Sequence, residues 1–339
     1  MKTRDFDFNI PKDMVAQVPM EPRDFSRLLV LHREDGSIEH TYFYNLPEYL
    51  NKGDALVFND SRVVKARVKG IGEDNKDVTI LLIRQLDSEK WEALVEVGKV
   101  EPGEKIFFPP AYKLSVLEVG AKIGKRDESL IKVGPISNTF LDTVGEAPVP
   151  PYIEGYKGDP ERYQTVYSRI RGSSAAPTAG LHFTDRLLEA LRGKGIRLCF
   201  VTLHVGIDTF MPVYEEDPID HKMYTEYCYL GEEVEDILHK VKREGKRVIG
   251  VGTTSCRTLE TASSSGLVRG FSGPTSLYIL PGYEWKTVDA MVTNFHYPQS
   301  TNIMMTAAFA GYDELKRTYR EAVKKGYRFY SFGDSTLIL

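Results

Sequence analysis

The chain has 339 residues, of which 42% are hydrophobic and 27% charged, and its formal net charge at pH 7 is −4. This composition is typical of a folded globular protein of one or two domains and argues against a fibrous or disordered chain. The mild acidic excess gives no support to a general nucleic-acid binder, which usually carries a basic excess, so any polyanion must be met by a local patch.

The amino terminus and the cysteines indicate a compartment. No apolar run follows the basic residues near the start, and nowhere do about 18 apolar residues follow one another, so we expect neither a signal peptide nor a membrane span. The three cysteines, Cys199, Cys228 and Cys256, form no CxxC pair, which suits a reducing compartment without structural zinc. We therefore expect a cytoplasmic protein without disulfides.

The first third of the chain contains strand patterns. GDALVFND, at residues 53–60, is typical of one strand. From residue 63 to residue 151, short alternating runs such as Val78, Ile80 and Leu82 recur between turn formers at hairpin-like spacing. This period-two patterning predicts a small antiparallel barrel of about six half-buried strands.

The remainder of the chain alternates between helical and strand patterns. TDRLLEALRGKG and EEVEDILHKVKREGK predict helices, and each is followed by an apolar run of strand length. Further helices are predicted at TSCRTLETASSSG, STNIMMTAAFAG and DELKRTYREAVKKG, and further strands at TVDAMVTNF and YRFYSFGD. The alternation predicts α/β layering.

Strand patterns therefore occur on both sides of the predicted barrel. We predict a mixed-sheet α/β main domain formed by both chain ends, residues 1–62 and 152–339. The antiparallel β-barrel domain, residues 63–151, is inserted between them.

Three histidines lie where strands or loops give way to the next element. His204 ends an apolar run, His296 follows the strand pattern AMVTNF, and His182 immediately precedes a predicted helix. Ligands of open α/β sheets gather outside the carboxyl ends of the strands, so histidines at such junctions are candidates for acid/base work or metal ligation. Each histidine alone also has a structural interpretation.

Two aspartates lie near these histidines in the sequence. Asp208 and Asp289 could orient an imidazole or hold a ribose, and either could instead cap a turn. Three histidines could hold a zinc ion with one open position, but HExxH, CxxC and closely paired His/Asp motifs are absent from the sequence.

A glycine-rich turn, GVGTTSCRTLE, separates a strand from a helix at residues 250–260. Free backbone N–H groups at a helix start accept a carboxylate or phosphate, so Thr253, Thr254 and Ser255 are candidate anion binders. The turn has neither the GxGxxG pattern nor the Walker A lysine, so it specifies neither a dinucleotide nor ATP. Hydroxyl residues that merely cap the helix are the structural alternative.

Seven segments, in this order and over nearly the whole chain, resemble the S-adenosylmethionine:tRNA ribosyltransferase-isomerase family of queuosine biosynthesis. They are MVAQVPMEPRDFSRLL, GDALVFNDSRVVKARV, RYQTVYSRIRGSSAAPTAGLHFT, VTLHVGIDTFMPV, RVIGVGTTSCRTLE, PGYEWKTVDAMVTNFHYPQST and YRFYSFGD. The chain departs from the family pattern at Tyr224, Ser276 and Gln299, where histidine, aspartate and a basic residue are expected, so no role is assigned to these three side chains.

The resemblance implies a reaction. The ribosyl part of S-adenosylmethionine is transferred to 7-aminomethyl-7-deazaguanine in a tRNA anticodon and isomerised to an epoxycyclopentane, while adenine and methionine leave. It also implies S-adenosylmethionine as co-substrate, no metal, and the fold predicted above. We expect a monomer.

The reaction needs several proton transfers, which a group of imidazoles suits. We expect His182, His204 and His296 to converge on the co-substrate as catalytic residues, together with Asp208. The predicted co-substrate contacts include the small-residue turn that presents His182, and they are Thr178, Gly180, Thr253, Thr254, Ser255 and Asp289. The predicted tRNA contacts are Arg27, Arg62, Lys65 and Arg171.

Two other classes of function remain open from the residues alone. A metal-dependent hydrolase would use the histidines as ligands. A non-catalytic RNA-binding adaptor would use the barrel, but it gives no reason for histidines at strand ends.

Overall fold

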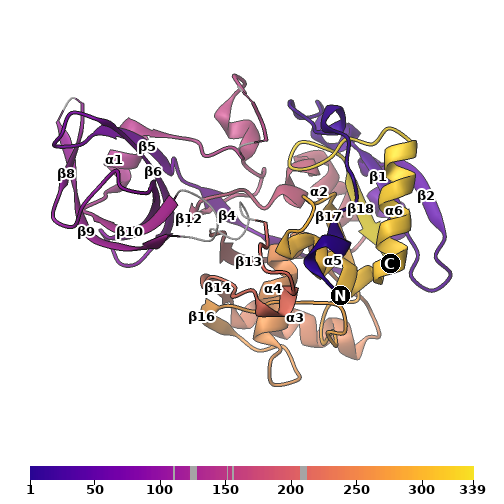
Figure 1. Ribbon diagram of the computed structural model, residues 1–339. Coiled ribbons are helices and arrows are strands. Elements are labelled where there is room, and N and C mark those ends of the chain that lie inside the picture. The colour runs from indigo at the N-terminus through magenta and orange to yellow at the C-terminus, as the bar shows by residue number, and fades with distance from the viewer. Residues whose placement is uncertain (110, 123–127, 151, 155, 207–211) are drawn as a thin grey trace.

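The computed structural model describes residues 1–109, 111–122, 128–150, 152–154, 156–206 and 212–339. These residues form a barrel and an α/β domain that lie side by side, and both termini lie in the α/β domain (Figure 1). The predicted fold class is confirmed.

The α/β domain is built on a mixed sheet of nine strands in the described part of the chain, in the order β16-β14-β13-β3-β15-β17-β18-β1-β2. The central strands β13, β3, β15 and β17 run parallel, whereas β18 is antiparallel to β17 and parallel to β1. The strand bounds are β1 (Arg27–Leu31), β2 (Ile38–Tyr42), β3 (Ala55–Asn59), β13 (Arg197–His204), β14 (Glu226–Leu230), β15 (Val248–Val251), β16 (Phe271–Thr275), β17 (Ala290–Asn294) and β18 (Ser335–Ile338).

Helices cover both faces of this sheet because its central strands are apolar on both sides. Ala55 and Val57 of β3 pack in one core with α3, α4, α5 and α6, while Leu56 and Phe58 pack in another with α2 and η4. Successive side chains of a strand point to opposite faces, so one apolar run supplies both cores. The helix bounds are α2 (Asp185–Gly193), α3 (Glu232–Arg243), α4 (Gly252–Ala262), α5 (Thr301–Ala310) and α6 (Tyr312–Lys324).

Short 3₁₀ turns complete the α/β domain and carry several of the residues discussed below. Their bounds are η1 (Thr3–Phe6), η2 (Lys12–Met14), η3 (Arg23–Phe25), η4 (Phe43–Tyr49), η5 (Pro160–Tyr163), η6 (Thr178–His182) and η8 (Pro218–Asp220).

The barrel is closed by a pairing between its first and fourth strands, β5 and β8, through Ile71 and Phe107. Alternate residues point inward as predicted, among them Val78, Ile80 and Leu82. The bounds are β5 (Arg67–Ile71), β6 (Asp77–Gln85), β7 (Trp91–Glu96), β8 (Lys105–Phe108), β9 (Tyr112–Lys122), β10 (Glu128–Gly134), the short β11 (Gly145–Glu146), and the helix α1 (Asn138–Val144) that packs on the barrel core.

The barrel strands lie within the predicted insertion, and the division at residues 63 and 151 stays a prediction. The connection between the domains is a small parallel pair, β4 (Ser61–Val63) with β12 (Ile170–Ser173). This pair brings the segment that enters the barrel beside a segment that follows it.

One predicted strand, YRFYSFGD, is wrong. Residues 327–334 form a turn with a single bridge at Phe329, and the strand β18 begins only at Ser335. Tyr330 adopts a φ of 69°, in the left-handed region, which no strand can accommodate. This strained residue reappears in the candidate site.

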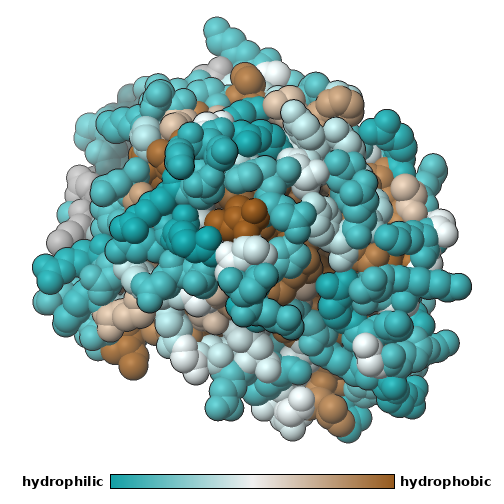
Figure 2. All heavy atoms as spheres, turned by 90° about the vertical axis from the view of Figure 1, so that its right-hand side faces the viewer, coloured by the Kyte–Doolittle hydropathy of each residue, from teal (hydrophilic) through white to brown (hydrophobic). Residues whose placement is uncertain are grey.

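The side of the molecule away from the barrel shows no broad apolar surface. Figure 2 shows that hydrophilic residues cover most of this face and that apolar residues appear in small separate groups. Small separate apolar groups of this kind are normal on a protein surface and do not by themselves indicate a binding site.

Candidate functional site

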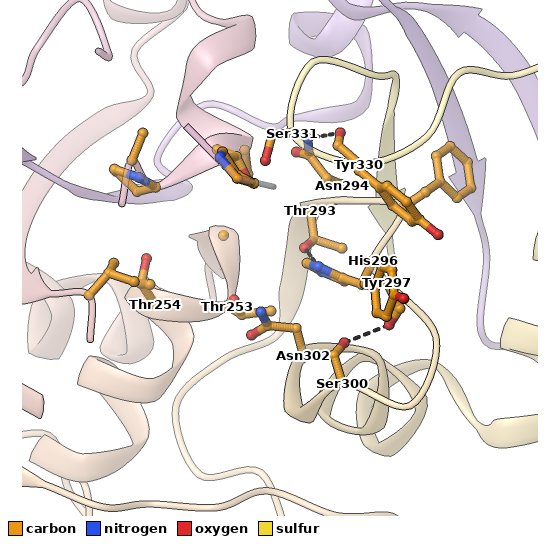
Figure 3. Close-up of a pocket in the computed structure, with 18 of the residues that line it drawn as sticks. Thr253, Thr254, Thr293, Asn294, His296, Tyr297, Ser300, Asn302, Tyr330 and Ser331 are labelled. Carbon is orange, nitrogen blue, oxygen red and sulfur yellow. Dashed lines mark hydrogen bonds between the residues drawn. The ribbon is translucent and has the colours of Figure 1, made fainter. Parts of the chain in front are cut away.

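A cavity of about 420 Å³, lined by four of the predicted site residues, lies at the carboxyl ends of the parallel strands β15 and β17, and we call it the main cavity. Its walls come from the start of α4, the segment after β17, the turn η6, the segment that returns from the barrel, and the turn at Tyr330 (Figure 3). Both the position and the size are those of a small-molecule site in an open α/β sheet.

His296 is the predicted histidine that lines this cavity. Its Nε2 lies 2.7 Å from the Thr293 hydroxyl (Figure 3). Its backbone N–H donates to the Tyr319 hydroxyl at 2.7 Å. Burial lowers the pKa of His296 to about 4, so the imidazole is neutral at pH 7. A neutral imidazole fixed in orientation can accept or donate one proton at the cavity wall.

His182 lies behind the cavity wall and is 4% exposed. Its Nδ1 is 2.7 Å from the Ser26 hydroxyl, its Nε2 is 3.3 Å from Asn294 Oδ1, and its ring packs on Phe43. Burial lowers the pKa of His182 to about 3. Asn294 lines the cavity and donates to the Tyr330 carbonyl at 3.0 Å, so Asn294 links His182 to the cavity wall.

His204 lines a second cavity, between the barrel and the α/β domain. Burial lowers its pKa, and the nearby Asp60 carboxylate partly offsets that effect. Thus the structure does not bring the three histidines together. The expectation of convergence is wrong because His182 faces the core and His204 faces away from the main cavity.

Two of the three residues predicted to bind an anion, Thr253 and Thr254, lie at the start of α4 and line the main cavity. The residue before the helix, Val251, provides no side-chain cap to the first-turn N–H groups. Ser255 does not line the cavity, because its hydroxyl is buried and donates to the Val251 carbonyl at 2.8 Å. The expectation for Ser255 is therefore replaced by a structural role.

Of the remaining described residues that were predicted to contact the co-substrate, one lines the main cavity and two do not. Thr178 lines the cavity, whereas Gly180 packs against Tyr167, whose hydroxyl would lie 2.0 Å from an added Cβ. Asp289 precedes β17, at the opposite end of the strand from Asn294, and its carboxylate binds Lys242 Nζ at 2.7 Å and the Val248 N–H at 2.7 Å. Asp289 does not line the main cavity, and its contact with the co-substrate stays a prediction. Asp208 lies outside the described residues.

Sequence reasoning missed an aromatic cluster in the cavity wall. The rings of Tyr152 and Tyr297 lie 4.9 Å and 5.4 Å from the ring of Tyr330, and all three tyrosines line the cavity. Tyr297 stands in HYPQST and Tyr330 in YRFYSFGD, so the matching segments contained them, but only the fold shows that they meet. A bulky residue held at positive φ, like Tyr330, is found where function requires strain.

The described lining of the main cavity carries no aspartate, glutamate, lysine or arginine side chain. Its polar groups are hydroxyls, amides and the His296 imidazole, several of which are labelled in Figure 3. Among the described residues, no group of three His, Cys, Asp or Glu could hold a metal ion.

Three of the four predicted tRNA contacts lie together where the domains join. Arg62 and Arg171 are register partners in the β4–β12 pair. Asp142 connects Lys65 with Arg171: its backbone carbonyl accepts from Lys65 Nζ at 2.9 Å, and its carboxylate binds Arg171 at 2.6 Å. Arg27 lies apart from them: its guanidinium stacks 3.7 Å above the Tyr327 ring.

Among the described residues, no helix combines the length and the apolarity that crossing a lipid bilayer demands.

Comparison with known proteins adds independent findings. The family model for "Queuosine biosynthesis protein" matches residues 3–338. The chain is 48% identical over 342 residues to the S-adenosylmethionine:tRNA ribosyltransferase-isomerase of Symbiobacterium thermophilum, and 47% identical over 345 residues to the proteins of that name from Dehalococcoides mccartyi and Clostridioides difficile, each alignment covering all of both chains. A crystal structure of S-adenosylmethionine tRNA ribosyltransferase from Thermotoga maritima is similar with a TM-score of 0.57 and 36% identity, covering 99% of this chain and 100% of that one.

Proposed function

We infer, because this chain belongs to the queuosine biosynthesis protein family, that it is an S-adenosylmethionine:tRNA ribosyltransferase-isomerase. It transfers the ribosyl moiety of S-adenosylmethionine to 7-aminomethyl-7-deazaguanine in a tRNA anticodon and isomerises it, giving epoxyqueuosine-tRNA, adenine and methionine. The full-length identity of nearly one half to three relatives of this name carries the conclusion.

The main cavity is the proposed S-adenosylmethionine site. The start of α4 would accept the methionine carboxylate on its free N–H groups, beside the hydroxyls of Thr253 and Thr254. Within the described part of the chain the hydroxyl of Thr254 is buried without a hydrogen-bond partner, which is expected of a group that hydrogen-bonds a ligand.

The sulfonium of S-adenosylmethionine is a cation, and the described cavity wall offers it no carboxylate. The faces of Tyr297 and Tyr330 supply the alternative, since an aromatic ring attracts a desolvated cation by its quadrupole. The Tyr152 hydroxyl, 2.7 Å from the Ser331 hydroxyl, holds its own ring in the cluster. Burial raises the pKa of Tyr152 to about 12, so this ring carries no charge.

His296 is the proposed proton-transfer residue. The reaction requires removal of an acidic C5′ proton next to the sulfonium, and His296 is the neutral imidazole on the wall of the proposed site. His182 is proposed as a positioning residue that orients Asn294. The catalytic role predicted for Asp208 remains a prediction.

The tRNA is proposed to bind where the domains join, with Arg62, Lys65 and Arg171 near its phosphates. Arg62 and Arg171 now pair with the carboxylates of Glu161 and Asp142, so tRNA phosphates would take the place of these two carboxylates. We propose that the enzyme acts as a cytoplasmic monomer and uses no metal.

Incubation with S-adenosylmethionine and precursor-bearing tRNA tests the function. The expected result is release of adenine and methionine in equal amounts, together with a modified tRNA. The same assay after dialysis against a chelator separates this enzyme from a metal-dependent hydrolase, because only the hydrolase would lose activity. Intact S-adenosylmethionine after incubation with the complete substrate pair would contradict the proposal.

A further inference from the structure

The second cavity, of about 500 Å³, lies between the barrel and the α/β domain. The end of β6 and the turn after it, residues 83–87, form one wall, and the ends of β12, β13 and β14 form the other. The Ser174 hydroxyl lies 2.8 Å from the Leu82 carbonyl and 2.9 Å from the Ile83 carbonyl, which ties β6 to the α/β domain beside the cavity. Domain junctions are a common place for ligand sites.

His204 presents an unused polar atom in this cavity. Its Nδ1 is buried and has no hydrogen-bond partner among the described residues. Gly172 packs against the ring edge: a Cβ at residue 172 would lie 2.9 Å from His204 Cε1 and 3.0 Å from Nδ1, and its backbone φ is 140°. A buried nitrogen without a partner costs free energy, and a ligand in the cavity would recover it.

Glu226 adds an acceptor to the same wall. The side chain is buried, and its Oε1 accepts the Gly206 N–H at 2.7 Å while its Oε2 pairs with Arg257. A carboxylate oxygen has lone pairs for more than one donor. The wall therefore favours a ligand that carries N–H groups.

An aromatic ring stands at the rim. Tyr227 lines the cavity, is 47% exposed, and has its hydroxyl 2.8 Å from that of Ser272. Unpaired RNA bases are bound by stacking on such rings and by hydrogen bonds to their edges.

The cavity also adjoins the cluster of cations proposed to meet tRNA. Arg171 directly precedes Gly172, which lines the cavity. Arg62 is the register partner of Arg171 on the neighbouring strand. Phosphates held by these arginines would place a neighbouring nucleotide at the mouth of the cavity.

We propose that the second cavity receives the tRNA base that carries the primary amine, extruded from its loop, with Tyr227 stacked on it and His204 and Glu226 bonded to its N–H groups. This assignment rests on the proposed function. It also gives each substrate its own cavity: Val205 lines the proposed S-adenosylmethionine site, and its neighbours His204 and Gly206 line the base site. The two substrates then approach one strand end from opposite sides.

The first test replaces the exposed rim tyrosine, which should not affect folding. Tyr227→Ala is compared with Tyr229→Ala, which removes an equally exposed ring from the same face of the same strand but outside the cavity wall. Binding of tRNA carrying the precursor base should weaken roughly tenfold or more in Tyr227→Ala only. Affinity for S-adenosylmethionine should be that of the wild type in both variants. Equal tRNA affinity in the two variants would overturn the assignment.

The second test acts from the barrel side and on the buried histidine. Leu86→Trp, at a 38% exposed position on the cavity wall, fills space with an indole and should raise KM for tRNA without raising KM for S-adenosylmethionine. His204→Gln should reduce the preference for the precursor base over guanine at the same position of the tRNA. Unchanged KM and preference would count against the cavity.

These outcomes separate the two proposals. If the wild-type protein binds S-adenosylmethionine but never modifies tRNA, the proposed function fails. If the wild type is active and Tyr227→Ala and Leu86→Trp equal it in tRNA affinity, only the assignment of the second cavity fails.

Discussion

His204 and Val205 are neighbours at the end of β13, but they line two different cavities. Successive side chains of an extended chain point to opposite sides, so a single strand end can serve two sites. In the proposed enzyme one site holds the ribosyl donor and the other the amine acceptor. A close arrangement of both substrates is what a transfer reaction needs.

Replacing His296 by alanine should lower the rate of adenine release about 10²- to 10⁴-fold, the usual contribution of a general acid or base. Binding of S-adenosylmethionine, measured by calorimetry, should persist because the aromatic and helix contacts remain. Thr293→Val is the matched variant: it removes only the hydroxyl that orients the ring, so a smaller loss is expected. Full activity in His296→Ala would remove His296 from the mechanism.

The free energy of unfolding should fall on mild acidification, in part because of His182 and His296 in the α/β domain. Burial lowers the pKa of His182 to about 3 and that of His296 to about 4, so below about pH 6.5 the unfolded chain binds protons that the folded one does not. Each histidine should reduce the free energy of unfolding by about 1.4 kcal/mol per pH unit down to its folded pKa.

His182→Gln should flatten this slope by one such contribution in denaturant titrations between pH 5 and 6, an interval of about one pH unit within the window above. An unaltered slope in His182→Gln would show that its imidazole does not titrate as described.

Tyr297→Leu should narrow the preference for S-adenosylmethionine over the uncharged S-adenosylhomocysteine. A desolvated cation–π contact contributes about 0.5 to 2 kcal/mol, so the ratio of the two dissociation constants should fall roughly 2- to 30-fold. Tyr229→Leu, which changes a residue of β14 outside the walls of both cavities, should leave the ratio unchanged. Equal ratios in Tyr297→Leu and the wild type would mean that the sulfonium is held by other groups.

Gly180→Ala should destabilise the protein by about 1 to 3 kcal/mol, as overpacking does, since its Cβ would meet the Tyr167 hydroxyl. That hydroxyl has no hydrogen-bond partner in the residues that the structure describes, so Tyr167→Phe alone should cost little stability, and adding it to Gly180→Ala should restore part of the loss. Gly193→Ala, with open space around the added methyl, is the control in the same thermal melts. Absence of partial rescue in the double variant would argue against the packing role.

Arg171→Ala should reduce the slope of the logarithm of the tRNA affinity against the logarithm of the salt concentration by about one unit, the value expected for the loss of one phosphate contact. Arg62→Ala should do the same. Arg27→Ala should not, because its guanidinium stacks on Tyr327 apart from the junction. A fall in slope for Arg27→Ala alone would place the RNA elsewhere.

Local patterns in the sequence were enough to predict the layers of the fold. Period-two runs such as Val78, Ile80 and Leu82 predict the strands of the barrel, and Thr184 caps α2 by accepting the Leu187 N–H. Both features depend only on residues that are close in the sequence. The seven family segments likewise indicated the reaction, because they depend on residue identity and order rather than on geometry. Helix and strand alternation indicated the order of elements around the insertion.

Only the tertiary structure decided which of these residues share a cavity. His182 bonds to Ser26 and Asn294, which lie 156 and 112 residues away in the chain, so its burial was invisible locally. The apolar neighbours of Tyr330 predicted an extended strand, but in the structure this residue lies in a turn at positive φ. The turn brings its ring to those of Tyr152 and Tyr297. Sequence periodicity determines which face of an element is buried, whereas the meeting of remote loops depends on how whole elements pack.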